Sequence, residues 1–301
     1  MASPRVVIAA PLFRAGEHLE EALQSLLAQT ERDFALVLVD DCSGDDTVAR
    51  ARELAAGDDR VEIHVNAERL GLLRNTNRAY LLARERFPNA EYFALGSDHD
   101  VWEPRWLERM LSALKANPHA VLAYPENARV AADGRRLREP WRFDTRGVAS
   151  PAKRLRRVAA GMAAGDMVYG LFSADALRAV GRPYRSVLYP DRLLLAELAL
   201  RGEFVQVPEI LWTRRLLALP GRRRQRRAFW PSDVPLRAHL PYSLVHAGVL
   251  CREHGARTAL LDFLPRSLAF EFLTTALALA YAGYLRARAP ARTAGRVRFR
   301  A

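Results

Sequence analysis

Short apolar runs alternate with longer amphipathic stretches over the first two thirds of the chain. The apolar runs are rich in β-branched residues and predict strands over 5–10, 34–39, 60–65, 91–95 and 119–124. Apolar positions three and four residues apart predict helices between them, over 17–29, 45–56, 72–86 and 104–116. Strands that alternate with helices in this way are typical of an α/β fold with a parallel, doubly wound sheet.

The pattern changes beyond the fifth strand. An Asp133-Gly134 pair predicts a tight hairpin turn within 130–137, and helices are predicted over 174–180 and 192–201, followed by a short strand over 204–208. From residue 213 arginines become frequent, and two apolar stretches predict helices over 242–254 and 265–285. We therefore expect two parts, an α/β domain over 1–214 and a helical, arginine-rich region over 215–301.

Polar or special residues follow four of the predicted strands at the point where each strand ends. Because ligands bind at the carboxyl ends of parallel strands, these residues mark the expected site. They are Pro11 after the first strand, Asp40 and Asp41 after the second, Asn66 after the third, and Asp98 and Asp100 after the fourth.

Asp98 and Asp100 are separated by one residue, His99. In an extended backbone, residues i and i+2 project to the same side, so both carboxylates can bind one hard divalent cation, Mn²⁺ or Mg²⁺, and leave positions open for phosphate oxygens. His99 is then expected to point the other way. The alternative is a solvated loop, or the N-cap of the helix that begins near Pro104.

Asp40 or Asp41 is well placed to accept hydrogen bonds from a nucleotide base or ribose. The carboxylate that does not face the ligand would instead cap the turn over 42–44. Arg74, at the start of the third predicted helix, can contact phosphate or base, or it is a surface arginine.

Composition and charge narrow the class of protein. The chain of 301 residues is 50% hydrophobic and 27% charged, which favours a globular fold over disorder. Cys42 and Cys251 lie far apart, so neither a disulfide framework nor a cysteine zinc site is expected. The first apolar run is too short for a signal peptide, which favours a reducing, cytoplasmic location.

The net charge of +12 lies almost entirely in the last part of the chain. Residues 1–212 carry 29 Lys and Arg against 30 Asp and Glu, whereas residues 213–301 carry 17 Arg against 4 acidic residues. A basic region on a neutral domain fits an anionic membrane surface, nucleic acid or an acidic partner; the alternative is a solvated arginine-rich surface.

The tail also contains an uncharged run of 14 residues, 272–285. This is shorter than the roughly 20 residues that a membrane span needs, so an interfacial or packed helix is expected. Three roles remain open: peripheral contact with an anionic membrane at the inner face of the cell, self-association, and packing on the first domain.

The strand-end residues lie in segments that together resemble family 2 glycosyltransferases. The similarity covers about residues 4–214, in the expected order. The segments are Pro11-Leu-Phe-Arg14, Leu19 to Thr30, Val39-Asp40-Asp41-Cys-Ser43-Gly-Asp45-Asp-Thr47, Asn66-Ala-Glu-Arg-Leu-Gly71-Leu-Leu-Arg74-Asn75, Asp98-His-Asp100 with Pro104 and Leu107, Tyr189-Pro-Asp191 with Gly202, and Val207-Pro-Glu-Ile-Leu-Trp-Thr-Arg214.

This resemblance implies a GT-A fold, with a mixed, mostly parallel sheet flanked by helices, and a nucleotide-sugar donor. It implies donor binding by Pro11, Asp40, Asp41, Arg74 and Asp98, and a metal held by Asp98 and Asp100. Asp191 matches the position of the catalytic base, although it could instead cap the 192–201 helix. The implied reaction is hexosyl transfer, with inversion, to a carbohydrate or lipid-linked acceptor in cell-surface polysaccharide or glycolipid synthesis.

The chain departs from the family pattern at two positions. Pro190 stands where Glu is common and Arg14 where Asn is usual, so acceptor contacts differ. A Gln-x-x-Arg-Trp segment does not follow Asp191, which favours transfer of a single sugar over processive synthesis.

Rival functions are a nucleotidyltransferase and a non-catalytic nucleotide- or nucleic-acid-binding protein. Without a nucleic-acid-binding motif in the basic tail, we expect no nucleic-acid partner.

Overall fold

The computed structural model describes residues 3–131, 135, 142–161, 164–187, 189–216, 242–255, 264–269 and 272. The predicted hairpin turn at Asp133-Gly134, most of the predicted 265–285 helix and most of the arginine-rich region lie outside these residues.

One half of the eight-stranded sheet is parallel, as predicted. Its strands occur in the order β3-β2-β1-β4, and each of the three contacts between neighbours is parallel. All residues of β2 are buried, which fits a strand covered on both faces. The bounds are Val6–Leu12 for β1, Phe34–Asp40 for β2, Val61–Val65 for β3 and Tyr92–Leu95 for β4.

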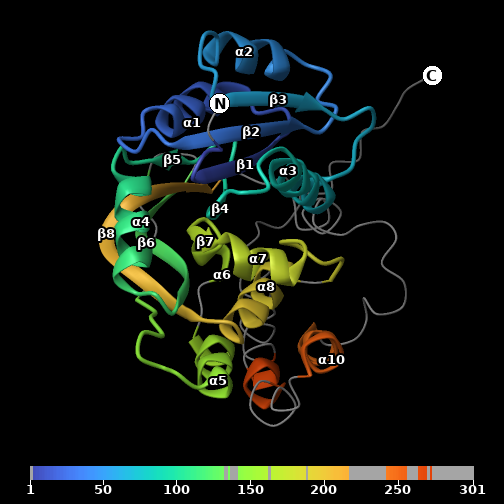
Figure 1. Cartoon of the computed structure of the whole chain (residues 1–301). Helices are drawn as coiled ribbons and strands as arrows, with labels where there is room; N and C mark the ends of the chain where they lie inside the picture. Colours follow the sequence, from blue (N-terminus) through green and yellow to red (C-terminus); the bar gives the residue numbers. More distant parts are fainter. Residues whose placement is uncertain are drawn as a thin grey trace, which may run out of the picture.

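The other half makes the sheet mixed, in the order β7-β6-β8-β5 (Figure 1). β7 runs antiparallel to both β4 and β6, β8 runs parallel to β6, and β5 runs antiparallel to β8. The expected mixed, mostly parallel sheet is confirmed, whereas the fully parallel sheet suggested by periodicity alone is wrong. The bounds are Val101–Trp102 for β5, Ala120–Ala131 for β6, Leu171–Ser173 for β7 and Glu203–Leu216 for β8.

Helices cover both faces of the sheet and bury two apolar clusters. Alternate β1 residues face opposite clusters: Val7 and Ala9 pack toward α3, α7 and α8, while Val6 and Ile8 pack toward α1, α2 and α4. Figure 1 shows these two groups of helices on either side of the strands. The bounds are Leu19–Leu27 for α1, after the short 3-10 helix Gly16–His18, Thr47–Leu54 for α2, Leu72–Arg86 for α3, Trp106–Ala116 for α4, Ala174–Val180 for α7 and Pro190–Ala199 for α8.

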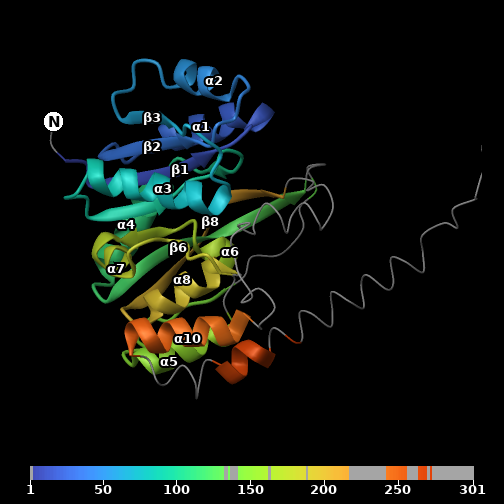
Figure 2. The same ribbon diagram turned by 90° about the vertical axis from the view of Figure 1, so that its right-hand side faces the viewer.

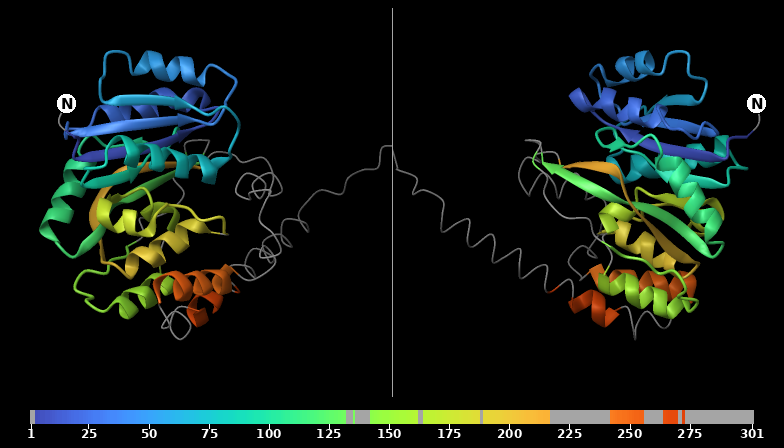
Figure 3. Two further views of the ribbon diagram at one scale, coloured as in Figure 1. Left: turned by 45° about the vertical axis from the view of Figure 1, so that its right-hand side comes forward. Right: turned by 90° about the vertical axis from the view of Figure 1, so that its left-hand side faces the viewer.

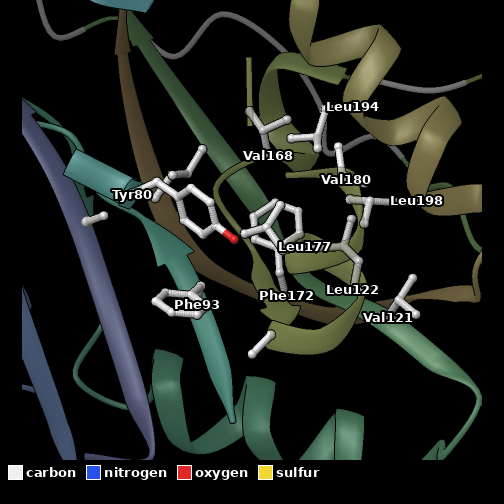
Figure 4. Close-up of a cluster of buried hydrophobic side chains, with 14 of the residues drawn as sticks. Tyr80, Phe93, Val121, Leu122, Val168, Phe172, Leu177, Val180, Leu194 and Leu198 are labelled. Carbon is white, nitrogen blue, oxygen red and sulfur yellow. The ribbon is translucent and has the colours of Figure 1, made fainter. Parts of the chain in front are cut away.

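The first cluster joins the two halves of the sheet. The rings of Tyr80 on α3 and Phe93 on β4 meet edge to face, with centroids 5.3 Å apart. Figure 4 shows them beside Phe172 of β7 and Leu177 of α7. Such a pair contributes about 0.5–1.5 kcal/mol beyond the burial of its area. The antiparallel strand β7 is therefore held by side chains as well as by its backbone bonds.

Gly170 lets the chain approach β6 closely just before β7 begins. A Cβ atom at this position would lie 2.3 Å from the carbonyl oxygen of Ala123. Glycine is therefore required here, because any side chain would push the two backbones apart. This contact holds the chain after α6, Ala164–Met167, close to β6.

A third cluster joins α8 to α5, Pro151–Gly161, and α10, Tyr242–His254. Figures 2 and 3 show α5 and α10 side by side next to α8. The buried Glu197 of α8 accepts hydrogen bonds from Arg185, at 2.7 Å, and pairs with His254 of α10, also at 2.7 Å. The helix predicted over 242–254 is therefore confirmed, and it packs against the α/β body. Within the described residues, no helix has both the length and the apolarity to span a bilayer.

Candidate active site

Asp40 and Asp41, at the end of β2, are both buried and hold two different loops. Asp40 accepts a hydrogen bond from the backbone N–H of Ser43, at 2.9 Å, and another from the Ser43 hydroxyl. Asp41 accepts bonds from the backbone N–H groups of Leu70, at 2.7 Å, and Gly71, at 2.8 Å. Capping of the 42–44 turn thus falls to Asp40. Each carboxylate oxygen has a second lone pair, so the donor-binding roles of both residues stay predictions.

The loop held by Asp41 leads directly into α3. Gly71, the residue immediately before this helix, has a φ of 82°, a conformation that residues with side chains rarely adopt. Asn75 in the first turn is buried and donates to the carbonyl of Val39 at 2.8 Å. Arg74, one residue earlier, is exposed. The structure therefore places Arg74 at the strand-end edge with its side chain toward solvent, and its donor-binding role stays a prediction.

The end of β1 is tied to the predicted metal-binding residues. Pro11 lies within β1, opposite Val39 of β2. Two residues later, the backbone N–H of Phe13 donates to Asp98 Oδ2 at 3.0 Å. The guanidinium of Arg69 lies over the Phe13 ring, 4.2 Å from its centroid. The structure thus brings the β1 loop, the loop before α3 and Asp98 together.

His99 does not point away from Asp98 and Asp100, so that expectation is wrong. Its Nδ1 lies 2.7 Å from Asp98 Oδ1, and its Nε2 lies 3.8 Å from Asp100 Oδ1. The reason is that β4 ends at Leu95, so the strict alternation of a strand does not extend to residues 98–100. Burial lowers the pKa of His99, but its hydrogen bond with Asp98 and the charge of Asp100 outweigh burial and raise the pKa overall.

Asp100 is fixed from the opposite side of the site by β8. Its Oδ1 accepts a hydrogen bond from the backbone N–H of Arg215 at 2.8 Å, and Arg215 Nη1 donates to the His99 carbonyl at 2.9 Å. Burial raises the pKa of Asp100, while the charge of His99 and the Arg215 hydrogen bond lower it. The buried carboxylate is therefore held in place before any ligand binds.

The donor set at this site suits a divalent cation. Asp98 and Asp100 supply carboxylate oxygens, which Mg²⁺ and Mn²⁺ prefer. In the structure the imidazole of His99 lies 2.7 Å from Asp98 Oδ1 and 3.8 Å from Asp100 Oδ1, so both carboxylates face a common point. Among the described residues, three ligand atoms lie within 4.8 Å of one another only at Glu197, Glu253 and His254, where Arg185 also pairs with both glutamates.

Asp191 lies in the first turn of α8, after Tyr189, which takes a left-handed conformation, and Pro190. Burial raises the pKa of Asp191, while the backbone N–H of Arg192 and the charges of Arg192 and Arg214 lower it. A raised pKa makes a carboxylate a stronger base. The helix dipole acts in the opposite direction, as expected for a first-turn position, but burial has the larger effect.

Tyr169 lies within the electrostatic influence of Asp98, Asp100 and Asp191. Burial raises the pKa of its hydroxyl well above the usual range, and the charges of Asp98, Asp100 and Asp191 all act on it. Its ring lies 4.8 Å from that of Trp212 on β8. The sequence did not point to Tyr169, because this tyrosine belongs to no recognisable motif. Tyr169 is therefore within electrostatic range of all three carboxylates.

Known proteins resemble parts of this chain in sequence. An uncharacterized glycosyltransferase of Haemophilus influenzae is 26% identical over 116 residues, which cover 38% of this chain and 34% of that protein. A putative teichuronic acid biosynthesis glycosyltransferase, TuaG, of Bacillus subtilis is 28% identical over 108 residues, which cover 36% of this chain and 41% of that protein. The matched segments thus span well under two thirds of these relatives.

Two solved structures share the fold. S. aureus TarS 1-349 in complex with UDP-GlcNAc has a TM-score of 0.63 at 14% identity, over 88% of this chain and 73% of TarS 1-349. The mannosyltransferase PcManGT from Pyrobaculum calidifontis, in complex with GDP-Man and Mn2+, has a TM-score of 0.58 at 18% identity, over 93% of this chain and 75% of that one. The family model for glycosyl transferase family 2 matches residues 7–175. The chain therefore belongs to glycosyl transferase family 2.

Proposed function

We propose that this glycosyltransferase moves a single sugar from a nucleotide-sugar donor to an acceptor hydroxyl, with inversion at the anomeric carbon. The observation that carries the proposal is the pair of carboxylates after β4, which backbone N–H groups hold in place: Phe13 donates to Asp98 at 3.0 Å and Arg215 donates to Asp100 at 2.8 Å. Asp191, in the first turn of α8, is the proposed base. A cation-binding pair and a base are what a metal-assisted displacement at a diphosphate-bound sugar needs.

In the proposed mechanism, Asp98 and Asp100 hold a divalent cation, Mn²⁺ or Mg²⁺. When bound, this ion neutralises charge on the donor diphosphate. Asp191 accepts the proton of the acceptor hydroxyl, whose oxygen forms a bond to the anomeric carbon as the bond to the diphosphate oxygen breaks. The hydrogen bonds from Phe13 and Arg215 keep the two carboxylates in position, so little reorganisation is needed during the reaction.

The donor pocket is proposed to lie between the loops that follow β1, β2 and β3, with Pro11, Asp40, Asp41 and Arg74 around the nucleoside. Support comes from the fold shared with proteins solved with UDP-GlcNAc and GDP-Man. The proposed acceptor is a carbohydrate or lipid, in cell-surface polysaccharide or glycolipid synthesis. Support comes from the similarity to TuaG, a putative teichuronic acid biosynthesis glycosyltransferase. A hexose is the proposed sugar.

Release of nucleoside diphosphate from a panel of nucleotide sugars tests this function. The protein, MnCl₂ and each donor are incubated with and without simple sugar acceptors. We expect one donor to yield nucleoside diphosphate and a glycosylated or hydrolysed sugar. Release of pyrophosphate from a nucleoside triphosphate would instead indicate a nucleotidyltransferase. Turnover of no donor at all would contradict the proposal.

We further propose that residues 1–214 form the catalytic domain and that 215–301 holds it at the inner, cytoplasmic face of the cell membrane. The excess of positive charge lies in 213–301, with 17 Arg against 4 acidic residues. Among the described residues, α5 adds an exposed basic face with Lys153, Arg156 and Arg157 next to α10 (Figure 2). Basic groups of this kind are attracted to anionic lipids.

Binding to liposomes that contain anionic lipid should therefore weaken as salt rises, because screening shortens the range of the attraction. Deletion of 265–301 should release most of the protein while leaving donor binding intact. Co-sedimentation with anionic and neutral liposomes measures both effects. Equal binding to the two kinds of liposome, or binding to neither, would contradict electrostatic docking and favour self-association or packing on the catalytic domain.

A further inference from the structure

The proposed mechanism does not use Arg214, a half-buried arginine on β8. Arg214 lies on β8, opposite Arg129 of β6, and directly precedes Arg215, whose backbone holds Asp100. Its side chain is 29% exposed, so ligands can reach it. It therefore lies beside the candidate metal-binding pair, on the strand that closes the site.

The guanidinium of Arg214 is oriented by α6. Arg214 Nη1 donates to Asp166 Oδ1 at 2.9 Å. The other oxygen of Asp166 accepts a bond from Arg129. Gly165 leaves room for the guanidinium, because a Cβ at that position would lie 2.9 Å from Nη1. The carboxylate of Asp166 thus pairs with both Arg129 and Arg214, and these three side chains together carry a net charge of one positive unit.

That charge lies on the strand segment that holds Asp100. Val101, the residue after Asp100, pairs with Thr213, the residue before Arg214. The backbone N–H of Arg215, the residue after Arg214, donates to Asp100 Oδ1 at 2.8 Å. A diphosphate bound at Asp100 therefore lies close to the part of β8 that carries Arg214.

We propose that Arg214 binds the diphosphate of the donor and stabilises the nucleoside diphosphate as it leaves. The inference rests on the proposed function and deepens it. As the bond from the anomeric carbon to the phosphate oxygen breaks, its electron pair stays on that oxygen, and a guanidinium is well suited to bind the resulting charge through two parallel N–H groups. Asp166 engages one of the five N–H donors of Arg214, which leaves donors for phosphate. Asp166 is accordingly a positioning residue.

The test compares nucleoside diphosphates with the matching monophosphates. Binding of UDP, UMP, GDP and GMP is measured by calorimetry in the presence of MnCl₂, for the parent protein and for Arg214→Met, Arg214→Lys and Arg109→Met. Arg109→Met is the matched control, because it removes an arginine that pairs with Glu209 of β8 away from the site. The informative quantity is the ratio of diphosphate to monophosphate affinity, which a general loss of folded protein does not change.

In Arg214→Met we expect this ratio to fall by about 10- to 100-fold, the effect of losing a charge-assisted contact. In Arg214→Lys the ratio should fall less, because lysine keeps the positive charge although it lacks the planar guanidinium with its parallel N–H groups. Arg109→Met should keep the parent ratio. An unchanged ratio in Arg214→Met, or an equal loss in Arg109→Met, overturns the role of Arg214 while the proposed function stands. If the parent protein binds none of these four nucleotides and neither ADP nor dTDP, the proposed function fails and the inference fails with it.

Discussion

Replacing Asp191 by Asn should lower the turnover of sugar transfer by about 10²–10⁴-fold, the usual contribution of a general base. Donor affinity should stay near the parent value, because Asp191 is expected to face the acceptor. Stability should not fall. Burial raises the pKa of Asp191, so folding disfavours its ionised form, and this penalty is present at neutral pH and disappears as pH falls. Asn removes the penalty and keeps a side-chain acceptor.

Steady-state kinetics, donor binding and thermal unfolding of Asp191→Asn measure these three effects. The parent enzyme should also lose activity as pH falls, with an apparent pKa above the usual aspartate range, because protonated Asp191 cannot accept a proton. The residual activity of the Asp191→Asn variant should not show this loss at low pH. Asp175→Asn is a matched control, because Asp175 is an exposed carboxylate on α7 that pairs only with the neighbouring Arg178 in the described contacts. Loss of donor affinity with turnover preserved would show that Asp191 binds the donor or caps α8.

Replacing Asp100 by Asn should reduce transfer by on the order of 10²–10³-fold, comparable with the removal of one group that stabilises the transition state. Binding of Mn²⁺ should weaken as well, because an amide oxygen carries no charge. The fold should survive, since the Asn Oδ1 can still accept the hydrogen bond from Arg215 and the buried charge is removed. Metal titrations with and without donor measure the change in affinity.

Asp98→Asn provides the comparison for this result. Asp98 is less buried than Asp100 and is tied to His99 and to Phe13. If both carboxylates hold the ion, each variant should need more Mn²⁺ for half-maximal activity. Full transfer by Asp100→Asn without divalent metal would contradict the assignment of this pair.

The sequence predicted the strands and helices of the first half of the fold well. The runs over 34–39 and 72–86 became β2 and α3 with almost the same bounds, because β2 is a continuous apolar run buried on both faces and α3 buries positions three and four residues apart. The position of Asp40, Asp41 and Asp98 directly after predicted strands also placed them at one edge of the sheet, since parallel strands end on the same side.

The second half was less predictable because its elements are short or depend on distant partners. β5 and β7 have two and three residues, too few for any period, and pairing with β8, β4 and β6 defines them. β8 was expected over 204–208 but extends to Leu216, since β6 and β5 supply partners for its polar end. The helices α5 and α6 were missed.

The same limits apply to the site. The orientation of His99 depends on the turn after β4, which alternation does not describe. Arg214 belonged to a recognisable strand, yet only the tertiary structure brings Asp166 and Tyr169 to it. Local patterns thus identified the acids that follow strands, whereas the groups that position and neutralise them come from elements distant in the sequence.

The central claim is that Asp98 and Asp100 couple a divalent cation to binding of a nucleotide sugar. Thermal unfolding of the parent protein and of Asp100→Asn should be measured with a panel of nucleotide sugars, each with and without MnCl₂, because a ligand that binds only the folded state raises its stability. We predict that one nucleotide sugar raises the unfolding temperature of the parent protein, more strongly with Mn²⁺, and that Asp100→Asn loses the Mn²⁺-dependent part. Stabilisation by no nucleotide sugar, or the same Mn²⁺-dependent increase in both proteins, would contradict the account.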